Sequence, residues 1–480
     1  MKILIAIDKF KGSLTSLQAA QAIRNGIEGA IADNTYEMVE IADGGDGSAN
    51  VLLSVKEGVE VVKAVGVNPS GQKIESSYLV YYEAGSSGSA AVDSAAGTGA
   101  VDSAASTGAG AVDSAAGAGA LKNCAFKKCA FIEMAKISGL ELIPPVDSEG
   151  RRLRNPLVTT TYGLGELIRK AYEDGANKIT LSIGGSATND GGTGMLQALG
   201  FKFYDKDGSL ITDYMCGGLL SRIGKIEAPS DGPFGRDCDV AAGACQIEVI
   251  CDVTNPLLGA TGATYVYGPQ KGADPVMLQQ LEQGMENLVR VAGEKIVGAK
   301  TSDCQVSGHA LPEHALPEPA LHEPALRERQ VQTHLLAGAG AAGGVGYAVN
   351  HFLGGKIISG WRFFANLTNL QQKIAQADLV ISGEGRIDSQ SLNGKVVDGV
   401  ITLAKEAGKP VWLFCGLNSL GTGGQSGQAP AYPIFQLASL EPDRDKSMQN
   451  AALLLERLAR QAATSHLNSD GGGNMPWRCL

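Results

Sequence analysis

Residues 178–199 read KITLSIGGSATNDGGTGMLQAL, and this stretch decides the fold class. Lys178–Ser182 is a short run of β-prone residues, typical of a buried strand. The glycine-rich loop Ile183–Gly192 follows it, and Gly191–Leu199 has the apolar spacing of a helix. A strand that passes through a tight glycine loop into a helix is the repeating unit of parallel α/β folds.

Strand and helix patterns alternate on both sides of this stretch. Strands are expected at Lys2–Ile7, Tyr36–Ile41, Val59–Val65, Ile74–Glu83, Ala130–Glu133, Glu248–Asp252, Ala377–Ser382 and Pro410–Phe414. Helices are expected at Ser16–Ala30, Ser48–Lys56, Leu164–Glu173 and Pro275–Val297. The alternation predicts parallel α/β layers, and the turn-rich middle of the chain predicts a second, mixed α/β domain.

The composition excludes several classes of protein. Of the 480 residues 64 are glycine, without the three-residue period of collagen. The formal net charge of −10 argues against a nucleic-acid-binding protein, which carries a basic surface. No apolar run reaches the ~18–20 residues that cross a bilayer. The excess of glycine predicts tight loops with exposed backbone amides, which suit phosphate binding.

The N-terminus and the cysteines indicate a cytoplasmic protein. The first apolar run, Ile3–Ile7, ends at Asp8 and is too short for the core of a signal peptide. The nine cysteines form no CxxC pair. In a chain of this length we therefore expect free thiols in a reducing compartment.

Two internal segments and the tail lack the pattern of folded structure. Ala84–Ala120 holds three near-copies of a ten-residue unit such as AVDSAAGTGA, and Asp303–His334 is rich in proline and holds four of the six histidines. Neither segment can bury enough apolar surface to offset chain entropy, so both are expected to be flexible insertions. A docking tag and a histidine metal site are the minor alternatives. Thr464–Leu480 is expected to be a loose tail.

Loops with an acidic residue in or just before them follow five of the strands, and three of these loops are glycine-rich. They are Asp8–Ser13, Asp43–Gly47, Ile183–Gly192, Val253–Pro256 and Gly383–Asp388. Ligands of open α/β sheets collect beyond the carboxyl ends of the strands. Carboxylates suit Mg²⁺, and backbone amides suit phosphate. The five loops therefore predict a site for magnesium and phosphate.

The segment from Gly184 to Gly192 is the strongest phosphate-binding candidate, because it supplies backbone amides and then enters a helix. Ser186, Thr188 and Asn189 add polar groups that a tight turn alone would not need. Asp190 has two open roles. It can accept the proton of a substrate hydroxyl, or it can cap the helix that follows.

Histidine catalysis is poorly supplied, because only His351 and His466 lie outside the proline-rich segment. A carboxylate is then the expected proton acceptor, as in protein kinases. The cations in or beside the loops are Lys11, Lys271 and Arg386. They can neutralise a phosphoryl group or a substrate carboxylate, although Lys271 is equally well explained as a surface charge.

Several nucleotide-binding motifs are absent from the sequence. There is no GxxxxGK[ST] loop and no HRD or DFG kinase motif. One GxGxxG match, Gly338–Gly343, has no clear strand before it and no acidic residue about 20 positions after it. A dinucleotide-binding oxidoreductase is therefore the alternative that this motif leaves open.

Seven blocks of this sequence together resemble the bacterial-type (type I) glycerate kinases, in the order of that family. They are DKFKGSL at 8–14, ADGGDG at 42–47, TTTYGLGELI at 159–168, IGGSATNDGGTGMLQALG at 183–200, CDVTNPLLGATGATYVYGPQKGA at 251–273, GAGAAGG at 338–344 and ISGEGRIDSQSLNGKV at 381–396. The resemblance spans Met1 to about Ala463. It implies phosphorylation of D-glycerate by ATP with Mg²⁺, usually to 2-phosphoglycerate.

The resemblance also implies a two-domain architecture with the active site between the domains. A Rossmann-like parallel-sheet domain is expected at 1–66 and 298–463, with the insertion at 303–334. An inserted, mixed α/β domain is expected at 67–297, with the insertion at 84–120, and the tail is 464–480.

The site residues implied by the resemblance come from the same loops. The expected catalytic residues are Asp190, Lys11 and Arg386. The expected substrate- and phosphate-binding residues are Asp8, Ser13, Gly44, Gly45, Gly184, Gly185, Ser186, Asn189, Asn255, Gly383, Glu384 and Asp388, and the expected metal ligands are Asp43, Asp46 and Asp252.

The implied partners are D-glycerate and ATP, with no nucleic acid and no membrane, and a homodimer is left open. Two alternatives remain. One is an NAD(P)-dependent oxidoreductase built on Gly338–Gly343. The other is a non-catalytic relative of the kinases that serves as a binding module.

Overall fold

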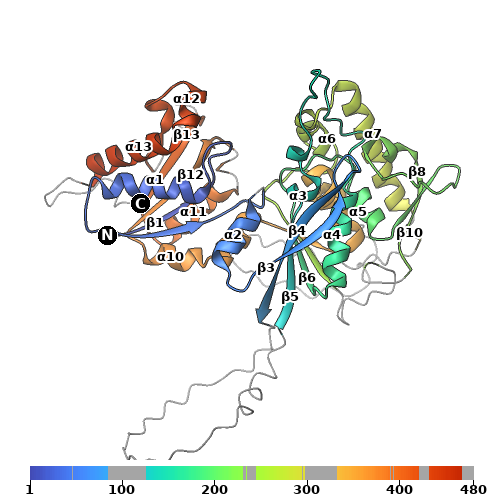
Figure 1. Cartoon of the computed structure of the whole chain (residues 1–480), viewed down its shortest axis with the longest axis horizontal. Helices are drawn as coiled ribbons and strands as arrows, with labels where there is room; N and C mark the ends of the chain where they lie inside the picture. Colours follow the sequence, from blue (N-terminus) through green and yellow to red (C-terminus); the bar gives the residue numbers. More distant parts are fainter. Residues whose placement is uncertain are drawn as a thin grey trace, which may run out of the picture.

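The computed structural model describes residues 1–45, 47–84, 126–230, 234, 245–294, 296–297, 332–389, 391–392, 394–420 and 432–467. Its first sheet combines both ends of this chain (Figure 1). The sheet order is β14-β13-β12-β1-β2, and every neighbouring pair is parallel. The strands are β1 (Lys2–Ile7), β2 (Thr35–Glu40), β12 (Leu379–Ile387), β13 (Val411–Asn418) and β14 (Ile434–Gln436).

Helices cover both faces of the first sheet, because side chains alternate along each strand. Ile3 and Ile5 of β1 pack with α1 (Ser16–Glu28) and α13 (Ala451–His466), which lie side by side in Figure 1. Leu4 packs on the opposite face with the helices of the second group. That group is α9 (Gly360–Leu367), α10 (Leu370–Gln376) and α11 (Val396–Glu406), and α12 (Arg444–Gln449) precedes α13.

The second sheet is mixed and has the order β11-β9-β6-β5-β4-β3. Its strands are β3 (Glu60–Val67), β4 (Lys73–Ala84), β5 (Phe126–Glu133), β6 (Lys178–Ser182), β9 (Gln246–Ile250) and β11 (Lys356–Ile358). The pairs from β5 to β11 are parallel, whereas β3–β4 and β4–β5 are antiparallel. The parallel half therefore directs four strand ends to one edge.

One face of the second sheet carries most of the remaining helices. They are α3 (Ala135–Ser138), α4 (Tyr162–Glu173), α5 (Thr193–Ala198), α6 (Ala263–Tyr267), α7 (Pro275–Glu294) and α8 (Val345–Leu353). A three-stranded sheet of β7 (Lys202–Asp205), β8 (Ile223–Glu227) and β10 (Ile296–Val297) packs with them. Short 3₁₀ turns lie at Leu140–Leu142, Gly217–Arg222, Pro269–Lys271, Thr333–Leu335, Ala341–Gly343 and Leu437–Ser439.

Helices α2 (Ser48–Val55) and α9 connect the two sheets. Leu52 of α2 and Phe364 of α9 share one apolar cluster with Leu4 of the first sheet and Phe131 of the second. Figure 1 shows α2 between the two sheets. The two sheets are therefore joined through a common core, and the loop that enters α2 lies where they meet.

Most of the predicted elements are present, and the α/β class is confirmed. Sheet membership divides the chain differently from the predicted ranges. Strand β3, expected in the first part, pairs with β4 of the second sheet, and β11 pairs there with β9. The sequence predicts a strand at Val59–Val65 but none at Lys356–Ile358, and the domain ranges implied by the resemblance do not reveal strand partners.

The predicted low-complexity segments fall largely outside the described residues. Residues 85–120 and 303–331 belong to the segments that are not described. At their described borders, Ala84 ends β4, and Thr333–Leu335 is a 3₁₀ turn. Helix α13 continues to His466, beyond the expected start of the tail at Thr464, because Ala462 and Ala463 are buried against the first sheet.

The described residues contain no helix that is long and apolar enough to cross a membrane. Five cysteines are described, and Cys129, Cys216, Cys251 and Cys415 among them are free thiols. The fifth is Cys245.

Candidate active site

The loop from Asp43 to Ser48 lies against the strand ends of the second sheet. Ser182, the last residue of β6, donates its hydroxyl to the carbonyl of Gly44 at 2.6 Å, and the amide of Gly184 donates to the same carbonyl at 3.3 Å. A β-carbon on Gly184 would lie 2.4 Å from the α-carbon of Gly45. Glycine is therefore required where the two predicted glycine-rich loops touch.

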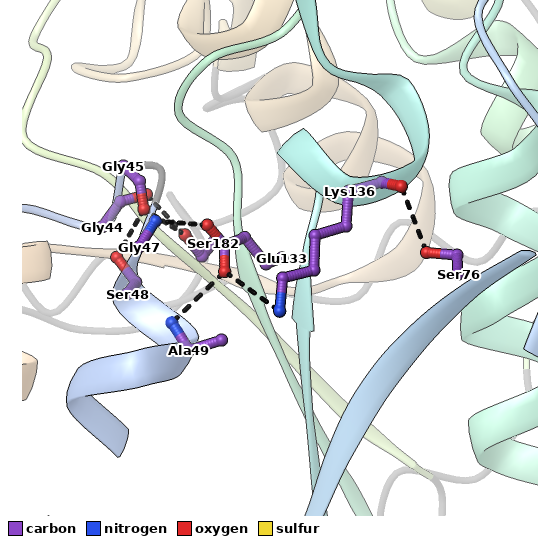
Figure 2. Close-up of polar contacts among 9 residues, drawn as sticks. All are labelled: Gly44, Gly45, Gly47, Ser48, Ala49, Ser76, Glu133, Lys136 and Ser182. Atoms are coloured by element: carbon purple, nitrogen blue, oxygen red, sulfur yellow. Dashed lines mark hydrogen bonds and ion pairs between the residues drawn. The ribbon is translucent and has the colours of Figure 1, made fainter. Parts of the chain in front are cut away.

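Glu133 holds the other end of this loop, as Figure 2 shows. Its carboxylate accepts a hydrogen bond from the amide of Gly47 at 2.5 Å and a second from the amide of Ala49 at 3.3 Å. Lys136 lies 3.9 Å from the same carboxylate, which is only 2% exposed. A buried acid at the end of β5 thus binds the start of α2.

Three carboxylates of the first sheet influence one another. Burial raises the pKa of Asp8 to about 8, and the nearby charges of Asp43 and Glu384 raise it further against the opposing charge of Lys9. Burial also raises the pKa of Glu384, to which Asp43 contributes. The Oε1 atom of Glu384 is buried and has no hydrogen-bond partner among the described atoms. Mutual repulsion of this kind favours a bound cation.

Asp252 follows β9 and caps helix α9. Its Oδ1 accepts from the hydroxyl of Ser359 and the amide of Gly360, each at 2.8 Å, and its Oδ2 accepts from the amide of Trp361 at 2.9 Å. Burial raises the pKa of Asp252 to about 6, and the neighbouring charge of Asp43 contributes. Both oxygens of this predicted metal ligand are thus engaged with the protein.

Asp190 is fully buried in the third loop, and both of its carboxylate oxygens accept hydrogen bonds. Oδ2 accepts from the amide and the hydroxyl of Thr161 at 2.8 and 2.7 Å, and from the amide of Gly194 at 3.3 Å. Oδ1 accepts from the amide of Gly192 at 3.1 Å. Burial raises the pKa of this carboxyl, and the hydrogen bonds oppose the rise. The contacts favour the capping role that the sequence left open.

Lys271 lies beneath the same loop and is only 2% exposed. Its Nζ donates to the carbonyl of Thr188 at 2.6 Å. Burial lowers the pKa of Lys271 to about 7, against the attraction of Asp190. The structure therefore excludes the surface-charge interpretation of Lys271. The hydroxyl of Thr188 and Oδ1 of Asn189 are buried without a partner among the described atoms.

The remaining predicted site residues differ in their surroundings. The hydroxyl of Ser13 donates to the carbonyl of Met448 near the end of α12, and Lys11 is exposed. Arg386 is exposed and donates to the hydroxyl of Ser419, while Asp388 accepts from Ser391.

Other predicted site residues form hydrogen bonds within the protein or lie in close contact with neighbouring backbone. The side-chain amide of Asn255 donates through Nδ2 to the carbonyl of Thr261, and its Oδ1 accepts from the hydroxyl of Tyr267. The carbonyl of Gly185 accepts from Leu140, and Ser186 bridges to Gly139. A β-carbon on Gly383 would lie 1.8 Å from the carbonyl oxygen of Phe414. Asp46 lies outside the described residues.

The glycines of the GxGxxG match serve as close backbone contacts. A β-carbon on Gly340 or Gly343 would lie 2.2 Å from the carbonyl oxygen of Pro256 or Thr188, respectively. The residues immediately before the motif, Thr333–Leu335, form a 3₁₀ turn and no strand. This arrangement supports a packing role and lacks the strand–turn–helix of a dinucleotide site.

The sequence analysis missed Glu133 and Ser182, which end two adjacent parallel strands and hold the loop of the first sheet. The available signal was their position, since both are polar residues that end a predicted buried strand. No three carboxylate, histidine or cysteine side chains in the described part of the chain are grouped closely enough to hold a metal ion by themselves. Mg²⁺ commonly uses one or two carboxylates together with phosphate oxygens and water.

Comparison with known proteins gives one consistent result. A sequence profile described as the glycerate kinase family matches residues 3–128 and 119–467. A "Glycerate 2-kinase" of Escherichia coli K12 is 37% identical over 411 residues, which cover 86% of this chain and 84% of that protein. A "Glycerate kinase" of Bacillus subtilis 168 is 34% identical over 468 residues, with 97% of each chain covered.

A solved structure is similar over nearly the whole chain. It is a crystal structure from Salmonella typhimurium LT2, described as a glycerate kinase 2, with 32% sequence identity and a TM-score of 0.62. The match covers 97% of this chain and 98% of that one. The two-domain arrangement described above is consistent with this neighbour.

Proposed function

The chain belongs to the glycerate kinase family, and on that premise we propose that it transfers the γ-phosphoryl group of ATP to a hydroxyl of D-glycerate. The product we propose is 2-phosphoglycerate. The observation that carries this proposal is the meeting of the Asp43–Ser48 and Gly184–Gly192 loops, where carboxylates and glycine backbone lie together.

Phosphoryl transfer needs positioning and charge neutralisation more than covalent chemistry by the protein. We propose that the amides of Gly184–Ser186 bind phosphate oxygens. Lys11 and Arg386 are exposed and therefore accessible to the phosphates or to the substrate carboxylate. Arg386 is suited to either anion, because its planar guanidinium forms paired hydrogen bonds.

The donors near Asp43 fit Mg²⁺ in chemistry, because they are hard carboxylate oxygens, and the charge of Asp43 raises the pKa of both Asp8 and Glu384. We propose that Asp43 holds this ion with help from Asp8 and Glu384. Asp46 and Asp252 stay in the proposed ligand set as expected from the sequence, although Asp252 would have to share its oxygens with α9. A bound Mg²⁺ would neutralise charge on the transferred phosphoryl group.

Two carboxyls are candidates for accepting the hydroxyl proton. Asp190 is the one expected from the sequence, and its existing hydrogen bonds would have to rearrange for it to reach a substrate. Asp8 is only partly buried at the end of β1, and its pKa of about 8 lies near a working pH. We propose that Asp190 supports the loop and that Asp8 is the alternative base, in which case Glu384 and not Asp8 assists Asp43 in holding the ion.

Cys129, Cys216, Cys251 and Cys415 are free thiols, which supports the proposal that the protein works in the reducing cytoplasm. A homodimer stays an untested expectation. The non-catalytic alternative is disfavoured by the carboxylates of Asp8, Asp43 and Glu384, which a binding module would not need in such close proximity.

The test is a coupled assay of ADP release with D-glycerate, ATP and Mg²⁺. The product is identified by ³¹P and ¹H NMR, which distinguishes 2-phosphoglycerate from 3-phosphoglycerate. Omission of Mg²⁺ and replacement of D-glycerate by other hydroxy acids are the controls. ADP release without dependence on D-glycerate would contradict the substrate, and a folded protein that releases no ADP would favour the non-catalytic alternative. A separate fluorescence titration with NADH tests the oxidoreductase alternative, which binding would support.

A further inference from the structure

Helix α2 lacks a local cap at its first turn. Its N-cap is Gly47, which has φ +90° and no side chain to accept hydrogen bonds. This left-handed backbone conformation favours glycine, so the position cannot readily carry the Ser, Thr or Asp that usually caps a helix. The first amides of α2 therefore need an acceptor from elsewhere in the chain.

Glu133 supplies that acceptor from the other sheet. It ends β5, and its carboxylate accepts from the amides of Gly47 and Ala49 (Figure 2). Glu133 and Ala49 are each 2% exposed. An unpaired amide at this depth would lose its hydrogen bonds to water without replacement. The side chain of Glu133, which belongs to the second sheet, thus caps helix α2, which lies between the two sheets.

Ser182 forms a second set of hydrogen bonds to this loop. It is the register partner of Glu133 in the parallel pair β5–β6, so the two side chains lie next to each other at one sheet edge. Ser182 donates to the carbonyls of Gly44 and Gly45, at 2.6 and 3.3 Å, whereas Glu133 accepts from amides further along. The loop is therefore held through its carbonyls at one end and its amides at the other.

The hydrogen bonds of Glu133 and Ser182 to the loop determine where Asp43 lies. Asp43 directly precedes the held segment, and its Oδ1 accepts from the amide of Gly45 at 2.9 Å. Its charge acts on Asp8, Glu384 and Asp252, so each of these three carboxyls lies near Asp43. Displacement of the loop would move Asp43 relative to groups supplied by both sheets.

We propose that Glu133 is a positioning residue for phosphoryl transfer, which fixes Asp43 and the following glycines by capping α2 from the second sheet. This proposal rests on the proposed function, because it assumes that the Asp43 loop takes part in the reaction. Glu133 acts through the backbone of the loop and needs no contact with substrate. Ser182 assists it from the adjacent strand.

The test compares Glu133→Gln and Glu133→Ala with the wild-type enzyme. Glutamine keeps the size of the side chain but has one accepting oxygen, so it can serve only one of the two amides well. We expect kcat to fall about tenfold in Glu133→Gln and about 100-fold in Glu133→Ala, with KM for D-glycerate changed less than about threefold, because misplacement of reacting groups acts mainly on the chemical step.

Glu166→Gln is the matched control. Glu166 lies on α4, and its carboxylate accepts a hydrogen bond from the backbone amide of Val67, the last residue of β3, at 2.9 Å. This bond also joins a carboxylate to a backbone amide of another element, but it does not involve the Asp43 loop. We expect its kcat to stay within about twofold of wild type, because it positions no part of the site. Ser182→Ala is a milder second variant for the case that Glu133→Ala does not fold.

Hydrogen exchange provides a readout that does not depend on activity. A peptide covering residues 43–52 should exchange at least about tenfold faster in Glu133→Gln than in wild type and Glu166→Gln. Unchanged exchange together with unchanged kcat in a folded Glu133→Gln or Ser182→Ala would overturn the positioning role. A wild-type protein that does not phosphorylate D-glycerate, while Glu133→Gln still loosens this peptide, would refute the proposed function and leave the cap supported.

Discussion

The Oδ2 atom of Asp252 accepts a hydrogen bond from the backbone amide of Trp361 at 2.9 Å. Asp252 follows a strand of the second sheet, whereas Trp361 lies in the first turn of α9, which packs on the first sheet. A β-carbon on Gly360, next to Trp361, would lie 2.2 Å from the carbonyl oxygen of Asp43. A displacement of the first turn of α9 would therefore also displace the Asp43 loop.

Replacement of Asp252 by alanine should weaken both stability and activity. The substitution removes a helix cap, which costs about 1–2 kcal/mol of unfolding free energy. Activity should fall at least about tenfold, because α9 packs directly on Asp43. Urea unfolding and the ADP-release assay provide the two measurements.

The control for Asp252 is Asp443→Ala. Asp443 caps α12 through a 3.0 Å hydrogen bond from the amide of Lys446, on an exposed helix. This variant should lose about 1 kcal/mol of stability and keep its activity. Equal activity losses in the two variants would show that the effect of Asp252 is only one of general stability.

The Asp190→Asn variant should be markedly less stable than wild type. An asparagine has one accepting oxygen and would place its NH₂ against donors that now bind the carboxylate. The expected loss is roughly 2–4 kcal/mol, because buried amide and hydroxyl groups become unpaired. Activity should fall at least about 100-fold, whether Asp190 supports the loop or takes the proton.

Stability separates the two roles of Asp190. Unfolding in urea should show the loss in Asp190→Asn, whereas Asp205→Asn, at the last residue of β7, should change stability by less than about 1 kcal/mol. A wild-type midpoint for Asp190→Asn, together with the loss of activity, would favour the role as base over that of loop support.

The Asp8 carboxyl predicts a pH dependence of stability. Its pKa is about 8 in the folded protein, against an ordinary value of 3.8. Between these pH values the folded chain keeps a proton that the unfolded chain has released, so Asp8 makes stability fall as pH rises from about 4 to about 8. Asp8→Asn removes this dependence and should raise Tm, with a gain that grows over this range and levels off above it.

Thermal unfolding at about pH 5 and about pH 8.5 measures this gain. The exposed Asp207 on the turn after β7 offers the control Asp207→Asn, whose Tm difference from wild type should stay nearly constant with pH. A gain for Asp8→Asn that shrinks as pH rises would contradict the assigned direction. The same variant should lose activity if Asp8 binds Mg²⁺ or accepts the proton.

The contact of Gly184 with Gly45 predicts that Gly184→Ala separates the two loops. The new β-carbon would meet the backbone of Gly45 at 2.4 Å, which no side-chain movement can relieve. We expect kcat to fall at least about tenfold, because a shift of about 1 Å in positioned groups is sufficient for larger losses.

Gly293→Ala is the control for this substitution. Gly293 lies near the end of α7, and a β-carbon there would have nothing within 4 Å. Alanine should therefore stabilise the helix by about 0.5–1 kcal/mol and leave kcat unchanged. A Gly184→Ala enzyme with wild-type kcat would remove the loop contact from the proposed site.

Local pattern was sufficient to predict most strands of the two larger sheets, but fewer than half of the α-helices in the described part of the chain. The strand at Lys178–Ser182 was predicted with the bounds that the structure has, because an apolar run between turn signals is a local property. The partner of a strand is not local. Neither β3 nor β11 carries a signal for the sheet that it joins, and their assignment required the hydrogen-bond register.

The sequence was sufficient to predict which loops form the candidate site, but not the role of each side chain in them. Position after a strand identified Asp8, Asp43 and Glu384, which lie near one another. It could not distinguish a side chain that faces the junction from one that is engaged with a helix, as Asp190 and Asp252 are. Burial was equally inaccessible from sequence, and Lys271 therefore looked like a surface charge.

The pairing of β1 with β12 has a consequence for how the chain folds during synthesis. Ile3 pairs with Leu379, so β1, an inner strand of the first sheet, gains this neighbour only after most of the chain has been made. Until then β1 has only β2 as a partner, and its apolar side chains lack the cover of α13. The second sheet is encoded earlier and can form first.

The N-terminal strand therefore completes its native contacts only late in synthesis, and contacts of such long sequence separation slow folding.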